Sequence, residues 1–394
     1  MNACSRSGSV ALVTFGPFAV PDSGLTIRSV VVARCLVEMG LAVHVFSIGE
    51  QDPASCGYQD VEPATTKILD PPDRVRLTAV PSKSRFALGT RARRLLHSEV
   101  SKYDAVIVES ALLLPALWLA GVRRPIIWDT NELETLHYSR LPRSLSASTK
   151  WMVWYLLEHW SARKADVLVS ISDADAREWA RCVPACVDKL MVADHAVLDG
   201  STRNSESGVS SRDDVVFVGT LRAKHNLVAA EWIIQKLVPQ LEGSRARVVM
   251  AGRDTDRLAT SSPNIRLLGF VEDVSEVIAG ASVCIAPLHA AAGVSTKILD
   301  YIHQGSRVLA TPVAAVGLED CPGITIASLD EFPVALRKLL ETSEDTQEAA
   351  IRRAAQADWY EEHCGQAHLI KQWRAILERV GVSLGDEGLP LSGG

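Results

Sequence analysis

With 394 residues, the chain is longer than one typical domain, and we expect two domains. Hydrophobic residues make up 47% of the sequence and charged residues 22%, which is the balance of a globular protein with a substantial core. The formal net charge of -6 gives no support to nucleic-acid binding, so any anion site is expected to be local.

The cysteines and the N-terminus bear on the cellular compartment. The eight cysteines are scattered without a CxxC pair, and we interpret them as reduced thiols of a cytoplasmic protein, not as disulfides or metal ligands. The first residues lack a basic stretch leading into an apolar core, which argues against a signal peptide. No apolar run is long enough to span a bilayer.

The first half alternates apolar runs with helical patterns, which is typical of a doubly wound parallel sheet. It opens with a predicted strand at 10–15, a loop containing Gly16 and Gly24, and a helix at 26–39. Further strands are predicted at 43–48, 75–80, 105–108, 125–128 and 167–171, and further helices at 88–101 and 112–120. The first loop lacks the GxGxxG spacing, so the dinucleotide fingerprint is absent.

Polar residues follow several of these strands. Ligands of such sheets lie beyond the carboxyl ends of the strands, and Gly16, Glu109, Asp129 and Glu132 stand there. Carboxylates at two adjacent strand ends suit acid–base or hydroxyl-orienting work. The alternative is that each carboxylate caps the following helix.

Two segments stand out by composition. Between Lys83 and Lys102, six basic residues stand against the single Glu99. We interpret this segment either as a solvated helix face or as a surface for an anionic membrane or a phosphorylated acceptor. The stretch at 151–160 (WMVWYLLEHW) is unusually aromatic, and its helical spacing favours core packing, with lipid or partner contact as the alternative.

A second alternation follows a polar segment. Residues 199–213 are rich in Ser, Gly and Asp and are predicted to link a domain at 1–198 to a domain at 214–357. Strands are predicted at 215–218, 246–251, 265–268, 283–286, 307–311 and 324–327, with a helix at 226–241. A last helix is predicted at 358–380, before a disordered tail at 383–394.

The strand at 283–286 leads through a small-residue loop into a helix. Amides of Val294, Ser295 and Thr296 would lack partners inside that helix and would favour an anion there. Lys297 and Asp300 share one helical face, so the lysine would suit a phosphate and the carboxylate a sugar hydroxyl. The alternative is a capped surface helix with an ordinary ion pair.

Several of these motifs together resemble one enzyme family. The motifs in the second half are FVGTL (217–221) with Asn226, NIRLLGFVEDV (264–274), APL (286–288) and GVSTKILDYIHQGSRVLATP (293–312). Those in the first half are DAVIVES (104–110), DTNELET (129–135) and ADVLVSIS (165–172). With these motifs the chain resembles the retaining nucleotide-sugar glycosyltransferases of family four, which have the GT-B fold of two Rossmann-like domains.

The resemblance implies a bacterial hexosyltransferase of polysaccharide or glycoconjugate biosynthesis. We expect it to be cytoplasmic, with peripheral contact at the inner membrane face through the segment from Lys83 to Lys102 as an alternative. Its donor would be a UDP- or GDP-sugar held by the second domain, and a hydroxyl acceptor would lie on the first domain. The helix at 358–380 would cross back to the first domain. The family requires no metal or other cofactor.

The resemblance also implies roles for particular residues. Lys297, helped by Arg222 and Lys224, would hold the pyrophosphate, and Asp300 would bind the ribose hydroxyls. Glu109 stands where many relatives carry a histidine beside the reacting sugar, so Lys297 and Glu109 are the catalytic candidates. The remaining donor-side candidates are Gly219, Gly269, Phe270, Val271, Gly293, Val294, Ser295 and Thr296. The acceptor-side candidates are Gly16, Gly24, Asp129 and Glu132.

The sequence departs from the family pattern at one motif. Relatives with a Glu-x7-Glu motif carry two glutamates where this chain has Ala292 and Asp300. Two alternatives therefore accompany the transferase hypothesis: a sugar-nucleotide epimerase of the GT-B type, and a catalytically silent subunit that binds nucleotide sugars.

Overall fold

The computed structural model describes most of the chain. The described residues are 8–15, 24–48, 67–69, 93–94, 96–131, 133–139, 145–197, 214–260, 262–290, 294–342 and 344–384. Some predictions lie outside these residues: those for Gly16, Glu132, Ala292 and Gly293, the strand at 75–80, the linker at 199–213, the basic residues before Arg93, and the tail after residue 384.

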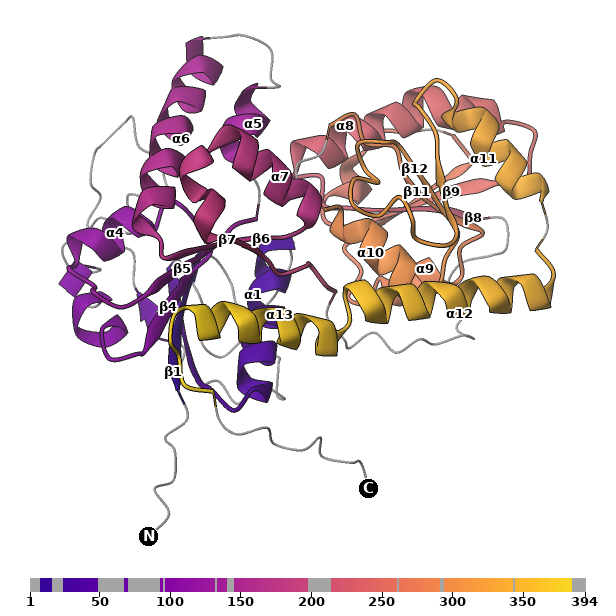
Figure 1. The fold of residues 1–394 in the computed structure, drawn as a ribbon. Helices are drawn as coiled ribbons and strands as arrows, with labels where there is room; N and C mark the ends of the chain where they lie inside the picture. The colour runs from indigo at the N-terminus through magenta and orange to yellow at the C-terminus, as the bar shows by residue number, and fades with distance from the viewer. Residues whose placement is uncertain are drawn as a thin grey trace. The chain divides into compact units, whose positions relative to one another are not determined.

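The chain forms two compact units (Figure 1). The first unit comprises Met1–His195 together with Gln366–Gly394, and the second comprises Ala196–Gly365. Each unit is an α/β layer structure built on one sheet.

The sheet of the first unit has seven parallel strands in the order β3-β2-β1-β4-β5-β6-β7. Its strands are β1 (Ser9–Phe15), β2 (Ala42–Ile48), β3 (Lys67–Leu69), β4 (Ala105–Val108), β5 (Ile126–Asp129), β6 (Val167–Ser170) and β7 (Leu190–Val192). Val10 is in register with Val43 on one side and Ala105 on the other. The strand order reverses between β1 and β4, and ligands of such sheets bind beside a reversal of this kind.

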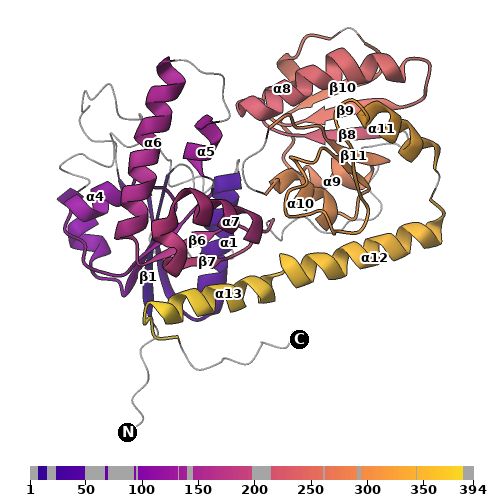
Figure 2. The ribbon, with the colours of Figure 1, turned by 45° about the horizontal axis from the view of Figure 1, so that its top comes forward.

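Helices cover both faces of this sheet, as its continuously apolar strands require. They are α1 (Gly24–Glu38), η2 (Leu96–Val100), α4 (Leu114–Leu119), α5 (Glu134–Ser139), α6 (Leu145–Lys164), α7 (Asp173–Cys182), η3 (Pro184–Lys189) and α13 (Gln366–Arg379). Ala11, Val13 and Val108 pack into one buried cluster with residues of α4, α6 and α7. On the other face α1 and α13 lie side by side (Figures 1 and 2).

The sheet of the second unit has six parallel strands in the order β10-β9-β8-β11-β12-β13, so its order reverses between β8 and β11. Its strands are β8 (Asp214–Val218), β9 (Arg247–Ala251), β10 (Ile265–Gly269), β11 (Val283–Ala286), β12 (Val308–Ala310) and β13 (Ile324–Ile326). Its helical elements are α8 (Lys224–Trp232), η4 (Ile233–Leu237), η5 (Val238–Leu241), η6 (Thr255–Arg257), α9 (Ser275–Ala279), α10 (Thr296–His303), α11 (Phe332–Glu341) and α12 (Thr346–His363).

The helix predicted at 358–380 is wrong, because the structure has two helices there. Helix α12 already begins at Thr346, behind an Asp345 capping box that the prediction missed, and α13 begins at Gln366. Gly365 lies between them, and a Cβ at this position would meet the carbonyl oxygen of Glu361 at 2.5 Å. The apolar spacing continues across the break, which is why the pattern suggested one helix.

The core packing predicted for the aromatic stretch at 151–160 holds only in part. The aromatic stretch of α6 buries Trp154 in the core, but Tyr155 is exposed and stacks on Trp151, with ring centroids 5.3 Å apart. Ser172 caps α7 by accepting a hydrogen bond from the Asp175 N–H at 3.1 Å. The Asp175 carboxylate accepts a hydrogen bond from Ser170 Oγ at 3.0 Å.

Candidate functional site

Polar side chains gather in each unit at the reversal of its strand order. In the second unit, α10 begins shortly after β11, and α8 begins shortly after β8. Since β8 and β11 are neighbours in the sheet, the first turns of both helices lie at the same edge. This is the edge at which an open parallel sheet binds its ligands.

Lys297 is the buried cation at this edge. Its Nζ donates a hydrogen bond to Asn226 Oδ1 and lies 4.4 Å from the centre of the Phe217 ring. Burial lowers the pKa of Lys297 to about 7, because removal from water disfavours the ammonium form, while Asp300 opposes the shift. The ammonium group contacts an amide and an aromatic face, and the Asp300 carboxyl, which is itself partly protonated at neutral pH, compensates its charge only in part. It is therefore suited to an incoming anion.

Asn226 fixes the position of this lysine. Its Nδ2 donates to the Thr220 carbonyl oxygen at 3.1 Å, which leaves Oδ1 to accept from Lys297. Gly219 lies directly beneath the amide, and a Cβ there would approach Asn226 Cγ to 2.9 Å. The predicted glycine thus allows the amide to pack closely over the loop after β8.

Asp300 follows Lys297 by one helical turn. Burial raises the pKa of its carboxyl to about 7, and Lys297 opposes the shift. The carboxylate makes no hydrogen bond with another described side chain, so its oxygens are available to hydroxyl groups. Tyr301 anchors the same helix, because its hydroxyl accepts from the Val218 N–H at 2.8 Å and lies 3.4 Å from the Ile285 carbonyl oxygen.

The N-terminus of α10 presents free donors. Ser295 is the N-cap residue, and its side chain makes no capping hydrogen bond. The N–H groups of Thr296 and Lys297 therefore have no partner inside the helix, whereas that of Ile298 donates to the Ser295 carbonyl oxygen at 2.9 Å. Val294 and Ser295 lead into this turn, as the sequence predicted. The unfilled amides and the Lys297 side chain lie on the same short segment.

The other donor-side candidates have different surroundings. Arg222 is exposed and its Nε lies 3.3 Å from Asp254 Oδ2, while Lys224 is exposed at the start of α8. Phe270 is exposed, and the Arg253 guanidinium lies 4.4 Å from its ring centre. Gly269 has a left-handed backbone with a φ of 68°, and Val271 is half-buried. None of these side chains shares the Lys297–Asn226 contact.

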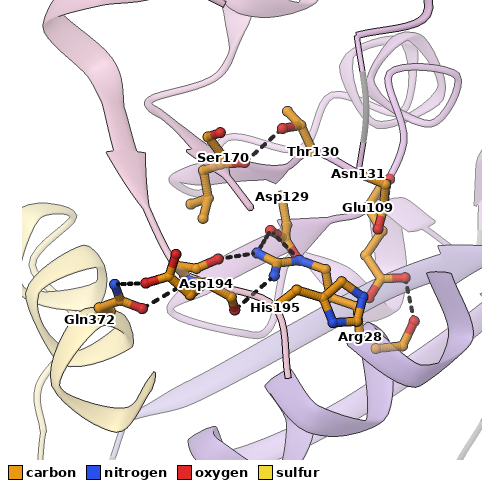
Figure 3. A network of polar contacts seen from close by, with 12 residues as sticks. Arg28, Glu109, Asp129, Thr130, Asn131, Ser170, Asp194, His195 and Gln372 are labelled. Carbon is orange, nitrogen blue, oxygen red and sulfur yellow. Dashed lines mark hydrogen bonds and ion pairs between the residues drawn. The ribbon is translucent and has the colours of Figure 1, made fainter. Parts of the chain in front are cut away.

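In the first unit, the predicted acceptor-side carboxylate Asp129 belongs to a buried ion pair (Figure 3). Arg28 on α1 binds it twice, with Nε 2.8 Å from Oδ2 and Nη2 2.6 Å from Oδ1. Arg28 also donates to the carbonyl oxygens of Ala193 and Asp194 at 3.0 and 3.2 Å. This geometry gives Asp129 a structural role at the end of β5. It caps no helix in the described part of the chain.

Glu109, at the end of β4, lies in the same region of the first unit (Figure 3). Ser29 Oγ donates to Glu109 Oε2 at 2.6 Å, whereas the buried Oε1 has no hydrogen-bond partner. Burial raises the pKa of the carboxyl to about 8, and the Ser29 hydroxyl only partly offsets this shift. The group is therefore mostly a neutral acid at neutral pH, and Oε1 is a free donor or acceptor.

The segment that leaves the first unit is fixed to α13. Asp194 Oδ2 accepts from Gln372 Nε2 at 2.7 Å and lies 2.9 Å from His368 Nε2. The next residue, His195, places its Nε2 3.2 Å from the carbonyl oxygen of Gly24, the predicted acceptor-side glycine at the start of α1. These contacts hold the carbonyl groups that Arg28 binds.

Sequence reasoning missed the partners of the two carboxylates. Arg28 and Ser29 interrupt the otherwise apolar pattern of α1, and this interruption was the available signal. Asn226 was noted only as part of a motif. Its contact with Lys297 joins helices that are far apart in sequence, so spacing gave no indication of it.

Two further observations concern ions and membranes. Among the residues that the structure describes, no group of three or more His, Cys, Asp or Glu side chains is arranged to hold a metal ion. In the same part of the chain, no helix is both long enough and apolar enough to cross a bilayer.

Two doubly wound units, each with polar side chains at the reversal of its strand order, define the GT-B class of fold, as the sequence predicted. Sequence models of known families agree: residues 23–185 match the glycosyl transferase 4-like domain, and residues 212–342 match the glycosyl transferases group 1. The chain belongs to this glycosyltransferase family, and the predicted enzyme class is confirmed. No curated protein sequence matches the chain.

Solved structures of glycosyltransferases are similar over nearly the whole chain. HepE from Anabaena, solved with UDP and glucose, is 13% identical, with a TM-score of 0.66 over 93% of this chain and 99% of that one. A glycosyltransferase from Rickettsia africae is 12% identical, with a TM-score of 0.69 over 96% and 100%. Sucrose-phosphate synthase from Thermosynechococcus elongatus is 14% identical, with a TM-score of 0.64 over 95% and 97%. At these identities the likeness establishes the fold alone.

Proposed function

We propose that the protein is a retaining hexosyltransferase that moves a sugar from a UDP- or GDP-sugar to a hydroxyl acceptor. The observation that carries the proposal is the buried Lys297 beside unfilled helix amides at the strand reversal of the second unit. That HepE was solved with UDP and with UDP-glucose supports a nucleotide-sugar donor for this fold.

The difficult step in such a transfer is departure of the nucleoside diphosphate, because negative charge builds on its oxygens. Preorganised amides and a cation stabilise that charge without reorganising during the reaction. Lys297 and the first turn of α10 supply both groups. Asp300, one turn along the same helix, is assigned to the hydroxyl groups of the ribose, and the loop from Gly269 to Val271 to the base.

Lys297 is also suited to respond to the donor. In the free protein its pKa is about 7, so only part of the population is charged at neutral pH. An adjacent diphosphate favours the ammonium form, and donor binding above neutral pH therefore takes up a proton. Isothermal titration in buffers of different ionisation enthalpy measures that uptake.

Glu109 is assigned to the acceptor side in the first unit. As a neutral acid with a free Oε1, it can donate a hydrogen bond to a sugar or acceptor oxygen, and as a carboxylate it can accept one. Lipid-linked glycans, polysaccharide chains and small alcohols all present such hydroxyl groups.

The function is tested with a panel of nucleotide sugars and candidate acceptors, measuring diphosphate release. Release that depends on an acceptor, with the α-configuration of the donor kept in the product by NMR, supports retaining transfer. Conversion of the donor without an acceptor indicates an epimerase, and binding without either reaction indicates a silent subunit.

The assignment of the site is tested by Lys297→Ala. Loss of one preorganised donor to a developing charge typically lowers the rate by about a hundredfold or more. The exposed Lys236 of η4 provides the matched control, and Lys236→Ala is expected to keep full activity. Full activity in Lys297→Ala would remove this residue from the site.

A further inference from the structure

Large apolar side chains are exposed together on α4 and α6 of the first unit. Leu145 is 91% exposed, Leu156 60%, Trp118 54%, Met152 48% and Leu119 47%. On α6, Leu145, Met152 and Leu156 fall on one helical face by their spacing of seven and four residues. Contiguous exposed apolar surface of this kind marks an interaction site more often than scattered single residues do.

The two helices form one surface. Trp118 of α4 meets Trp160 of α6 edge to face, with ring centroids 5.9 Å apart, and Lys164 Nζ lies 5.6 Å from the centre of the Trp118 ring. Tyr155 adds a further exposed aromatic ring on α6. The α4–α6 patch is defined as Trp118, Leu119, Leu145, Met152, Tyr155 and Leu156.

The exposed charges of the two helices themselves are basic. Lys150, Arg163 and Lys164 are exposed on α6, and Arg123 is exposed after α4. The single acidic residue of the two helices, Glu158, is buried and accepts from the Glu134 N–H of α5 at 2.8 Å. Asp166, which follows α6, is exposed, and its Oδ2 accepts from the Ile126 N–H at 2.8 Å. The patch therefore combines apolar and aromatic groups with a mainly positive rim.

We propose that the α4–α6 patch docks the protein on an anionic lipid surface. Aromatic and long apolar side chains enter the boundary between headgroups and acyl chains, while lysine and arginine bind the headgroups. A symmetric dimer through the patch would bring the same basic residues of two copies face to face, which is unfavourable. The proposal goes beyond the assignment of a transferase, and it does not depend on it.

The interaction is measured by co-sedimentation of the full-length protein with phosphatidylcholine vesicles, with and without phosphatidylglycerol. Wild-type protein is expected to bind the anionic vesicles and to be released by salt, since each basic residue near the surface contributes to binding within a Debye length. The double variant Met152→Glu/Leu156→Glu and the charge variant Arg163→Glu/Lys164→Glu are each expected to bind at least about tenfold more weakly.

Matched controls carry the same substitutions elsewhere. Val334→Glu/Ile351→Glu changes exposed apolar residues of α11 and α12, and Arg337→Glu/Lys338→Glu reverses exposed charges of α11. Both controls are expected to bind vesicles like the wild type, and circular dichroism with thermal melting verifies that every variant is folded.

Three results would overturn the proposal. The first is a wild-type protein that does not bind anionic vesicles, and the second is equal binding by the patch variants and their controls. The third is a wild-type dimer in light scattering that Met152→Glu/Leu156→Glu converts to a monomer, because the patch would then be a contact between copies. None of these measurements requires activity, so they stand apart from the test of transfer.

Discussion

The ammonium group of Lys297 and the amide oxygen of Asn226 are joined by a hydrogen bond between α10 and α8. An amide orients the lysine without neutralising it, whereas a carboxylate in the same place would compete with a ligand anion. The contact lies beside the reversal of the strand order, between helices that begin after β11 and β8. The arrangement therefore holds a positive charge ready at the edge where the sheet binds ligands.

Replacing Lys297 by methionine is expected to change how stability depends on pH. The pKa of Lys297 is lowered from 10.5 to about 7 in the folded protein, so the unfolded chain binds more protons between these values. Wild-type stability therefore gains up to about 1.4 kcal/mol per pH unit from this group as the pH rises through that window. Lys297→Met lacks this gain. Urea unfolding at several pH values measures the free energy of unfolding of each variant, and Lys236→Met is expected to follow the wild type.

Asn226→Asp places a carboxylate against the Lys297 ammonium. The new charge is expected to raise the pKa of the lysine, because an opposite charge favours its protonated form. It also offsets the charge that a diphosphate would meet, so UDP affinity is expected to fall by about tenfold or more, in line with the energy of a close charge pair. Titration calorimetry measures this, and an unchanged affinity would contradict the assignment of Lys297 to the diphosphate.

The fold was largely predictable from the sequence. The errors of the prediction have local causes. Continuous apolar runs such as that of β4 mark buried parallel strands, and glycines after them mark the turns. The break at Gly365 left the apolar spacing intact, so periodicity gave no sign of it. Tyr155 follows the same helical spacing as the buried Trp154, and burial depends on which neighbour packs there.

The candidate site was predictable only in part, because the sequence shows residue types but not their partners. Lys297 and Glu109 were found from their places at the start of a helix and the end of a strand. Arg28 forms an ion pair with the Asp129 carboxylate, which lies 101 positions further along the sequence, and no local pattern indicates such a pairing. The free Oε1 of Glu109 depends likewise on how α1 packs beside β4.

Glu109→Gln is expected to remove a pH dependence of stability whose sign is opposite to that of Lys297. The pKa of Glu109 is raised from 4.5 to about 8 on folding, so the folded protein binds more protons between these values. The stability that this group contributes is fully present below about pH 4.5 and is lost as the pH rises through 8, by at most about 1.4 kcal/mol per pH unit. Relative to wild type, Glu109→Gln should therefore become more stable toward pH 8. The exposed Glu341→Gln on α11 should show no such trend.

Asp129→Asn is expected to destabilise the first unit strongly. The substitution leaves the Arg28 guanidinium buried without a counter-charge, and breaking a buried pair in this way costs about 3–5 kcal/mol. Arg28→Met/Asp129→Leu, which removes both charges, is expected to lose less than the sum of Arg28→Met and Asp129→Leu. Chemical denaturation of the wild type, these two single variants and the double variant gives the coupling energy. The exposed pair of Arg181 and Glu178 supplies the control, since Glu178→Gln should change stability by no more than about 0.5 kcal/mol.

Gly252→Ala tests the backbone beneath the Lys297–Asn226 contact. Gly252 has a φ of 133°, and a Cβ there would lie 2.3 Å from the carbonyl oxygen of Gly219, which in turn packs under Asn226. The clash is with backbone, so the loop after β8 must move, and we expect a loss of stability of about 2–4 kcal/mol together with weaker UDP binding.

Gly243→Ala is the control that separates backbone strain from the steric clash, because Gly243 has a φ of 81° with nothing within 4 Å of its Cβ position. That variant should cost only about 1 kcal/mol and leave UDP affinity unchanged. Equal effects of the two alanines on stability and binding would show that the close approach to Gly219 does not support the site.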